Sequence, residues 1–276
     1  MSGPLLEGAA PSASADAAKQ CCARLYESEI VSRLLGDSFH PGGLALTERL
    51  GHLLELSADS HVVDAASGTG ASALFLARRF GCRVSGFDLS GQNVERATSE
   101  AARQGLSDRV RFTCGDAERL PLADQSVDAV ICECAFCTFL DKAGAARQFA
   151  RILRPGGRVG LSDITRAPDR SEELNDLMAW VACLADARSS ETYTEWLTAA
   201  GVTITTVEPH DEALMEMVGA IGAKLFAAEV LVGLKKLDLP GINLEAAKRM
   251  ARQALVAVNE GRLGYAIICG VRPSFR

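Results

Sequence analysis

The sequence has few aromatic residues and no long apolar run. Phe, Trp and Tyr make up 5% of the 276 residues, and no apolar stretch approaches the roughly 18 residues that a membrane span needs. Basic residues are scattered as single residues and pairs, and 29 Lys and Arg are outnumbered by 35 Asp and Glu. These absences argue against a membrane protein and a nucleic-acid-binding protein, so we expect a small-molecule partner.

Signals for secretion and for a disulfide framework are also missing. The N-terminus lacks the basic segment and apolar block of a secretory signal. The nine cysteines are an odd number, and several lie inside strand-like apolar runs, which is unlike a disulfide framework. We therefore expect a cytoplasmic protein with free thiols.

Short apolar runs alternate with helix-like segments over most of the chain. The runs that predict strands cover 61–66, 82–88, 110–116, 127–133, 157–163, 202–209 and 263–273. Strands buried on both faces that alternate with helices are typical of a parallel, doubly wound α/β sheet.

The expected organisation is a short tail and one domain. Residues 1–18 are rich in Ala, Ser, Gly and Pro and show no periodicity, which favours a disordered tail. The domain over 19–276 divides into a helical cap (19–56), a core (57–210), a helical insert (211–261) and a last strand (263–273).

The ends of the first three strands carry the best-defined chemistry. The first strand enters the glycine-rich turn VVDAASGTG (62–70), whose backbone can approach a ligand closely. Asp88 ends the second strand and can accept both hydroxyls of a ribose. Asp116 follows the third strand and can accept an adenine amino group, while the amide of Ala117 serves a ring nitrogen. Each aspartate alone could be a strand-end cap, but with Asp64 in the first strand they predict an adenosine-type ligand.

These segments resemble the motifs of class I S-adenosylmethionine-dependent methyltransferases. VVDAASGTG is similar to their first motif, GFDLS to the second, GDAERLP to the third, and ARILRPGGRVGLSD to the following helix, turn and fifth strand. The resemblance spans about 44–210 and implies a Rossmann-like sheet of seven strands, the last one antiparallel, with S-adenosylmethionine as cofactor. It implies cofactor contacts at Asp64, Ser67, Gly68, Gly70, Asp88, Leu89, Asp116, Ala117 and Glu133.

Two details qualify this resemblance. The family usually has Gly where Ala66 stands, and the extra methyl group narrows the room beside the methionine portion. A nicotinamide-dependent Rossmann enzyme is the structural competitor, but the turn reads DAASGTG rather than GxGxxG.

Within the class, the chain most resembles arsenite methyltransferases. That family has a cysteine after the fourth strand, as in ICECAFCTFLDK, and another in a context like AWVACLADA. The resemblance implies that Cys134 and Cys183 are catalytic and bind trivalent arsenic, with Cys22 as a third ligand and a thiol reductant as partner. The family's further cysteine is absent from LGDSFHPGG, which favours an arsenical that already carries an organic group unless Cys22 or Cys137 substitutes.

Thiolates suit this chemistry because sulfur ligands select soft centres. The arsenic lone pair can attack the sulfonium methyl without a general base, whereas an oxygen or nitrogen acceptor usually needs one. His40, in the HPGG loop, is the best candidate base among the four histidines. A thiol that reacts beside a cofactor is expected to have a lowered pKa.

The cysteines also have a structural interpretation, because free Cys is among the most buried residue types. We expect core positions for Cys82, Cys114, Cys132 and Cys269. Two other functions therefore stay open. One is S-adenosylmethionine-dependent methylation of another small molecule, with structural cysteines, and the other is non-enzymatic metalloid binding.

Overall fold

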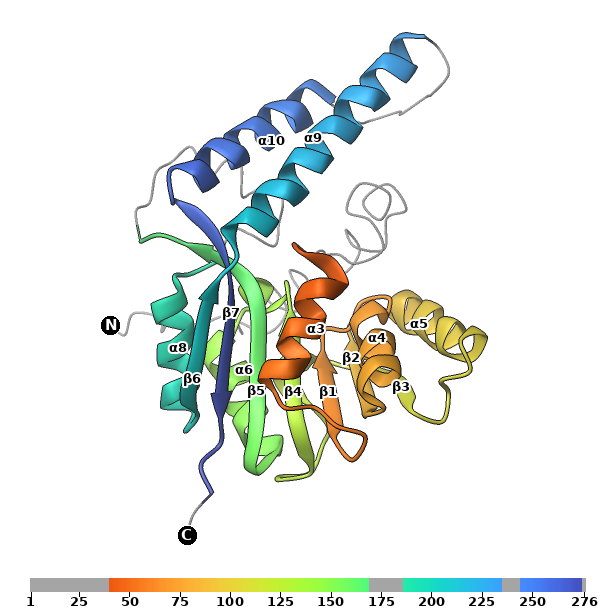
Figure 1. The fold of residues 1–276 in the computed structure, drawn as a ribbon, viewed down its shortest axis with the longest axis vertical. Coiled ribbons are helices and arrows are strands. Elements are labelled where there is room, and N and C mark those ends of the chain that lie inside the picture. Colours follow the sequence, from red (N-terminus) through yellow and green to blue (C-terminus); the bar gives the residue numbers. More distant parts are fainter. Residues whose placement is uncertain (1–39, 169–185, 235–243, 275–276) are drawn as a thin grey trace, which may run out of the picture.

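A seven-stranded sheet forms the centre of the computed structural model, which describes residues 40–168, 186–234 and 244–274 (Figure 1). Its order is β3-β2-β1-β4-β5-β7-β6. The strands are β1 (His61–Ala65), β2 (Arg83–Asp88), β3 (Val110–Cys114), β4 (Val127–Glu133), β5 (Leu153–Arg166), β6 (Thr203–Pro209) and β7 (Leu263–Val271). Strands β1 to β5 pair in parallel, and β7 runs antiparallel between β5 and β6. The predicted doubly wound sheet with an antiparallel last strand is confirmed.

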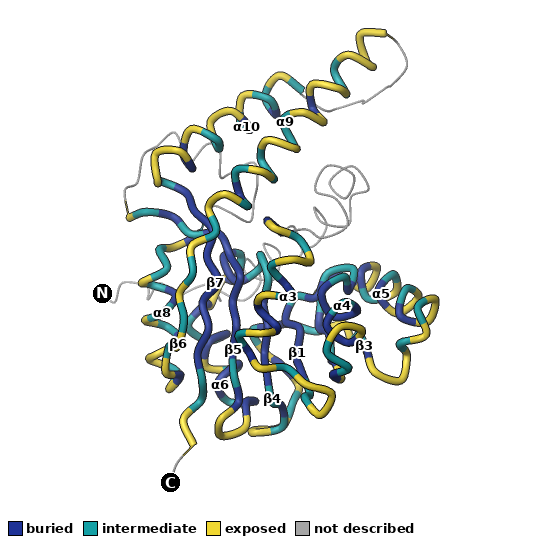
Figure 2. The backbone as a smooth tube through the Cα atoms, in the orientation of Figure 1, coloured by how far each residue is buried: buried dark blue, intermediate teal, exposed yellow. Residues whose placement is uncertain are grey.

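Helices cover both faces of the sheet, and the central strands are buried (Figure 2). This burial on both faces explains the nearly continuous apolar character of these strands. One face packs against α3 (Gly43–Leu53), α4 (Ala71–Phe80) and α5 (Gly91–Arg103), and the other against α6 (Lys142–Ile152) and α8 (Ser190–Ala199). Two short 3₁₀ turns, η1 (Ala117–Arg119) and η2 (Phe136–Thr138), follow β3 and β4.

The expected insert contains two helices that project beyond the end of the sheet (Figure 1). They are α9 (Asp211–Gly233) and α10 (Leu244–Asn259). Leu225 of α9 packs with Ala247 and Ala251 of α10, which holds the two helices together. Within the described ranges, no helix is long and apolar enough to cross a membrane.

Strand β5 differs from its predicted bounds. It begins at Leu153 rather than at 157 and continues to Arg166, so the expected turn RPGG lies within the strand. Leu153 pairs with Val127, and the register then shifts before Ala129 pairs with Arg158. This irregularity takes up the extra residues, as a β-bulge does.

The strand order reverses between β1 and β4, which places a topological switch point at their carboxyl ends. Ligands bind in the crevice at such a point in open α/β sheets. The predicted tail over 1–18 and the part of the helical cap before residue 40 lie outside the described residues.

Candidate functional site

A cleft opens at the carboxyl ends of β1, β2 and β4 and extends to η1 and η2. Eight of the nine residues predicted to contact the cofactor line it: Asp64, Ser67, Gly68, Asp88, Leu89, Asp116, Ala117 and Glu133. Gly70 does not line the cleft. The topology therefore brings together strand ends that are far apart in the sequence.

The turn after β1 needs residues that tolerate a left-handed backbone. Gly68 and Gly70 have φ values of 53° and 84°, and Ala66 has a φ of 63°. Gly70 precedes the first residue of α4, and a Cβ there would lie 2.5 Å from the ring of Phe112. Gly70 thus serves the turn itself, while Ala66 holds a conformation that favours glycine.

Asp88 joins the ends of β1 and β2. Its Oδ2 accepts a hydrogen bond of 2.8 Å from the backbone amide of Gly68, and its Oδ1 accepts one of 2.9 Å from that of Ser90. The Ser90 hydroxyl then caps α5 by accepting a hydrogen bond from the amide of Asn93. The carboxylate is consequently fixed at the edge of the cleft.

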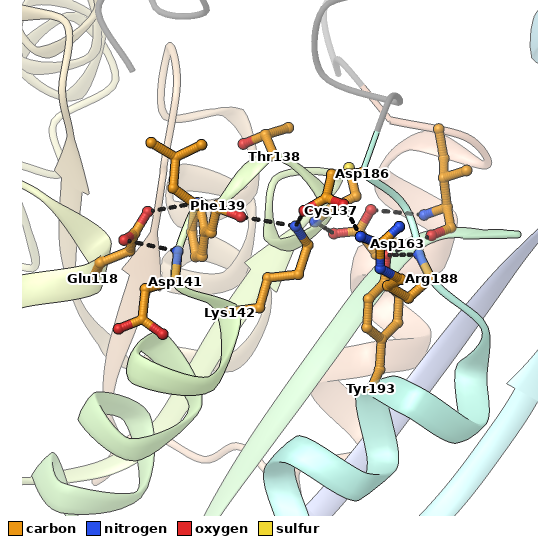
Figure 3. A network of polar contacts seen from close by, with 12 residues as sticks. Glu118, Cys137, Thr138, Phe139, Asp141, Lys142, Asp163, Asp186, Arg188 and Tyr193 are labelled. Carbon is orange, nitrogen blue, oxygen red and sulfur yellow. Dashed lines mark hydrogen bonds and ion pairs between the residues drawn. The ribbon is translucent and has the colours of Figure 1, made fainter. Parts of the chain in front are cut away.

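Asp116 and Glu118 order the opposite wall. Asp116 Oδ1 accepts a hydrogen bond of 2.9 Å from the amide of Glu118 and so caps η1. The Glu118 carboxylate in turn accepts hydrogen bonds from the amides of Leu140 and Asp141 (Figure 3). The loop after η2 is thereby tied to the end of β3.

Three buried side-chain oxygens of the described cleft have no hydrogen-bond partner: Asp64 Oδ2, Ser67 Oγ and Asn93 Oδ1. Burial, with the nearby Glu133 and Asp88 carboxylates, raises the pKa of Asp64 well above its usual range. Unpaired buried polar atoms are costly. The cleft thus offers acceptors to a ligand that carries hydrogen-bond donors and positive charge.

The charge of the cleft also favours a ligand that carries positive charge. Its carboxylates belong to Asp64, Asp88, Asp116, Glu118 and Glu133, and no Lys or Arg occurs among the described residues that line it. S-adenosylmethionine has a cationic sulfur, an ammonium group, ribose hydroxyls and an adenine amino group. The residues present therefore fit this cofactor.

Glu133 and His40 meet Thr47 of α3 on the wall near β4. The Thr47 hydroxyl donates to Glu133 Oε2 at 3.1 Å, and His40 Nε2 lies 3.3 Å from Thr47 Oγ1 and 3.7 Å from Glu133 Oε2. Both His40 and Glu133 line the cleft. The pairing of Thr47 with Glu133 was not predicted, because nothing in the sequence marks a threonine inside a helical segment as a partner of a distant strand end.

Cys134 lies directly after β4 and lines the cleft as predicted for a residue next to the ligand crevice. It has a φ of 51°, and its amide donates to the Ser162 carbonyl at 2.7 Å. Burial of the thiol, together with the carboxylates of Asp163 and Glu133, raises the pKa of Cys134 well above its usual range. The expectation of a lowered pKa is therefore wrong for this thiol, because burial and then the surrounding carboxylates oppose a thiolate.

A polar network extends from η2 to β5 and α8 (Figure 3). The amide of Cys137 donates to Asp163 Oδ2 at 3.0 Å, and the amide of Ile164 donates to Asp163 Oδ1 at 2.7 Å. Burial raises the pKa of Asp163 to about 6. Tyr193 of α8 closes the network by donating to the Ile164 carbonyl. This network fixes the segment that carries Cys134 and Cys137.

The remaining cysteine predictions have different outcomes. Cys82, Cys132 and Cys269 are buried as expected, but Cys114 is exposed. Strand β3 is an edge strand, and Cys114 is its last residue, so no neighbouring strand covers it. Cys183 and Cys22 lie outside the described residues. Among residues 40–168, 186–234 and 244–274, no group of three or more His, Cys, Asp or Glu is arranged to hold a metal ion.

The cleft also contains residues that the sequence did not single out. Asn93, Thr138 and Phe139 line it from α5 and from the segment after β4. Asn93 could have been found from the sequence, because Ser90 is a typical helix cap and a cap accepts a hydrogen bond from the amide three positions later. Thr138 and Phe139 had none.

The chain is similar to known proteins over the region that forms this cleft. Residues 63–161 match the family model described as a methyltransferase domain. The chain is 34% identical over 155 residues to methyltransferase GfsG of Streptomyces halstedii, which covers 56% of each chain. It is 30% identical over 155 residues to an arsenite methyltransferase of Halobacterium salinarum, which covers 55% of this chain and 39% of the relative. The chain thus spans about half the length, or less, of these curated relatives.

A solved structure shares the fold. Phosphoethanolamine N-methyltransferase 2 of Haemonchus contortus, in complex with S-adenosyl-L-methionine, superposes with a TM-score of 0.79 at 18% identity. The match covers 93% of this chain and 60% of that one. At this identity the likeness concerns the fold.

Proposed function

We propose that the protein is a class I S-adenosylmethionine-dependent methyltransferase that transfers a methyl group from this cofactor to a small-molecule acceptor, since residues 63–161 match a methyltransferase domain. The observation that carries the proposal is the group of unpartnered buried oxygens at Asp64, Ser67 and Asn93, inside an acidic cleft at the switch point of the sheet. S-adenosylmethionine supplies a methyl group activated by a cationic sulfur.

The proposed cofactor contacts follow the strand ends. Asp88 accepts hydrogen bonds from the ribose hydroxyls, and Asp116 with the amide of Ala117 binds the adenine ring. The turn containing Gly68 allows the methionine portion to approach the backbone. Glu133 provides negative charge next to the cationic groups, Asp64 does so once the bound cation favours its ionised form, and the acceptor lies beyond them, beside Cys134.

Two measurements test this function. Calorimetry with S-adenosylmethionine and S-adenosylhomocysteine measures cofactor binding directly. Incubation with methyl-labelled S-adenosylmethionine and a panel of alcohols, phenols, amines and trivalent arsenicals, followed by mass spectrometry, identifies the methylated class. Failure to bind the cofactor would overturn the proposal and favour a non-enzymatic metalloid-binding protein.

A trivalent arsenical, either arsenite or an organoarsenical, is a second candidate acceptor, and the position of Cys134 at the cleft favours it. Lys142 Nζ donates to Asp186 Oδ2 at 2.6 Å and to the carbonyl of Phe139, which lines the cleft. Cys183, the second predicted arsenic ligand, lies outside the described residues. The raised pKa of Cys134 opposes this candidate, because arsenic must displace the thiol proton.

Cysteine variants test the arsenical directly. If Cys134 and Cys183 bind arsenic, replacing either by Ser abolishes turnover of a trivalent arsenical in the presence of a thiol reductant and leaves cofactor affinity unchanged. The exposed Cys114→Ser variant is the matched control and keeps wild-type turnover. Arsenical turnover that survives both substitutions would exclude this assignment.

A further inference from the structure

His40 lines the cleft, and both of its ring nitrogens have neighbours that hold the ring in a fixed orientation. The residue is 7% exposed, and its Nδ1 lies 3.2 Å from the carbonyl oxygen of Pro41. A carbonyl oxygen can only accept, so Nδ1 carries the hydrogen in that contact and Nε2 is the nitrogen left to accept one. Nε2 faces Thr47 and Glu133 rather than solvent.

Thr47 and Glu133 can stabilise a proton on Nε2. Thr47 is fully buried, and its hydroxyl hydrogen bonds with Glu133 at 3.1 and 3.3 Å. The Thr47 hydroxyl can donate to an unprotonated Nε2, and once Nε2 carries the proton, Nε2 donates to Thr47 Oγ1 while the Thr47 hydroxyl donates to Glu133. The imidazolium then lies beside an opposite charge at 3.7 Å. This arrangement is that of a general base with two positioning partners.

Resting on the proposed methyltransferase function, we infer that His40 takes the proton that a hydroxyl acceptor releases on methylation. The acceptor oxygen bonds to the methyl carbon, the carbon–sulfur bond breaks, and sulfur keeps the electron pair. The O–H proton passes to His40 Nε2, directly or through the Thr47 hydroxyl. Methylation of an arsenic lone pair releases no proton, so it does not require this base.

The charge of the cleft narrows the acceptor further. Five carboxylates line the cleft, and the part of it formed by described residues offers no Lys or Arg to a phosphate or carboxylate group. Among the described residues, the position beside His40 therefore favours a neutral alcohol or phenol over an anionic substrate.

Acceptors of graded acidity test the role of His40. The rate of transfer from methyl-labelled cofactor is measured for benzyl alcohol, phenol, 4-nitrophenol and a trivalent methylarsenical with a thiol. His40→Gln lowers transfer to the weakly acidic hydroxyls by about 100-fold or more, and to the readily ionised 4-nitrophenol by less than about tenfold, because a general base typically contributes about 10²- to 10⁴-fold. His52→Gln, on the exposed side of α3, is the control and retains wild-type rates.

Variants of Thr47 test its role beside His40, and the outcomes distinguish the inference about His40 from the proposed function. Thr47→Val is expected to lose rate in the same pattern, and Thr47→Ser, which keeps the hydroxyl, is expected to restore it. An equal loss for every acceptor, or transfer to no hydroxyl in the panel by a protein that binds the cofactor, overturns the inference about His40. A wild-type protein that does not bind S-adenosylmethionine overturns the proposed function itself.

Discussion

Lys142 and Asp186 form an ion pair of 2.6 Å between a buried ammonium and a half-exposed carboxylate. The Lys142 side chain is 3% exposed and that of Asp186 is 49% exposed (Figure 3). Lys142 also donates to the Phe139 carbonyl at 2.7 Å. The pair ties a residue shortly before α8 to the first residue of α6.

This asymmetry predicts unequal effects of removing the two partners. Asp186→Ala leaves a buried ammonium without its counter-charge, whereas Lys142→Met leaves a carboxylate that water can solvate. We expect Asp186→Ala to lower the free energy of unfolding by about 1–3 kcal/mol more than Lys142→Met. Urea denaturation measures both, and the double variant should resemble Lys142→Met. Equal losses in the two single variants would show that burial of Lys142 does not govern the pair.

Asp163 predicts a change of stability with pH. Burial raises its pKa from 3.8 to about 6, so the folded protein holds a proton that the unfolded chain has released between these values. The stabilisation is complete below pH 3.8 and is lost as the pH rises through about 6. From pH 7 to pH 4.5, the unfolding free energy of the wild type should rise by about 2 kcal/mol relative to Asp163→Asn.

Denaturation series at the two pH values, with the exposed Asp108→Asn as control, check this prediction. The comparison with a variant cancels the contributions of other titrating groups, including Asp64, which are the same in both proteins. A difference between wild type and Asp163→Asn that does not depend on pH would contradict the assignment.

Ala66 is held at a φ of 63°, where glycine is favoured. Replacing it by Gly relieves a strain of about 1–2 kcal/mol and adds backbone freedom to the unfolded chain. We expect Ala66→Gly to raise the free energy of unfolding by about 0.5–1 kcal/mol, as measured by urea denaturation. Ala102→Gly, in an exposed turn of α5, is the matched control and should lower it by about 1 kcal/mol. A comparable loss in both variants would rule out strain at Ala66.

The sequence predicted the sheet and the strand-end aspartates for a physical reason. Asp64, Asp88 and Asp116 lie in or next to apolar runs of strand length, and the carboxyl ends of parallel strands meet at one edge. Local patterns therefore determined both the fold class and the position of these side chains at the cleft.

Features that depend on spatial order were not predictable in the same way. Cys114 ends an apolar run like those of Cys82 and Cys132, and only the strand order shows that β3 is an edge strand. The contact between Thr47 and Glu133 joins residues 86 positions apart. The pKa of Cys134 depends on burial and on Asp163 of a neighbouring strand, neither of which periodicity reveals.

Binding of S-adenosylmethionine to matched aspartate variants tests the central claim most directly. Asp88 lies at the cleft, whereas Asp108 lies in the exposed loop before β3. Calorimetry should show one cofactor bound per chain, an affinity lowered about 10- to 100-fold in Asp88→Ala because hydrogen bonds to a charged group are lost, and wild-type affinity in Asp108→Ala. No binding by the wild type, or equal affinities in both variants, would contradict a cofactor site at the ends of β1, β2 and β4.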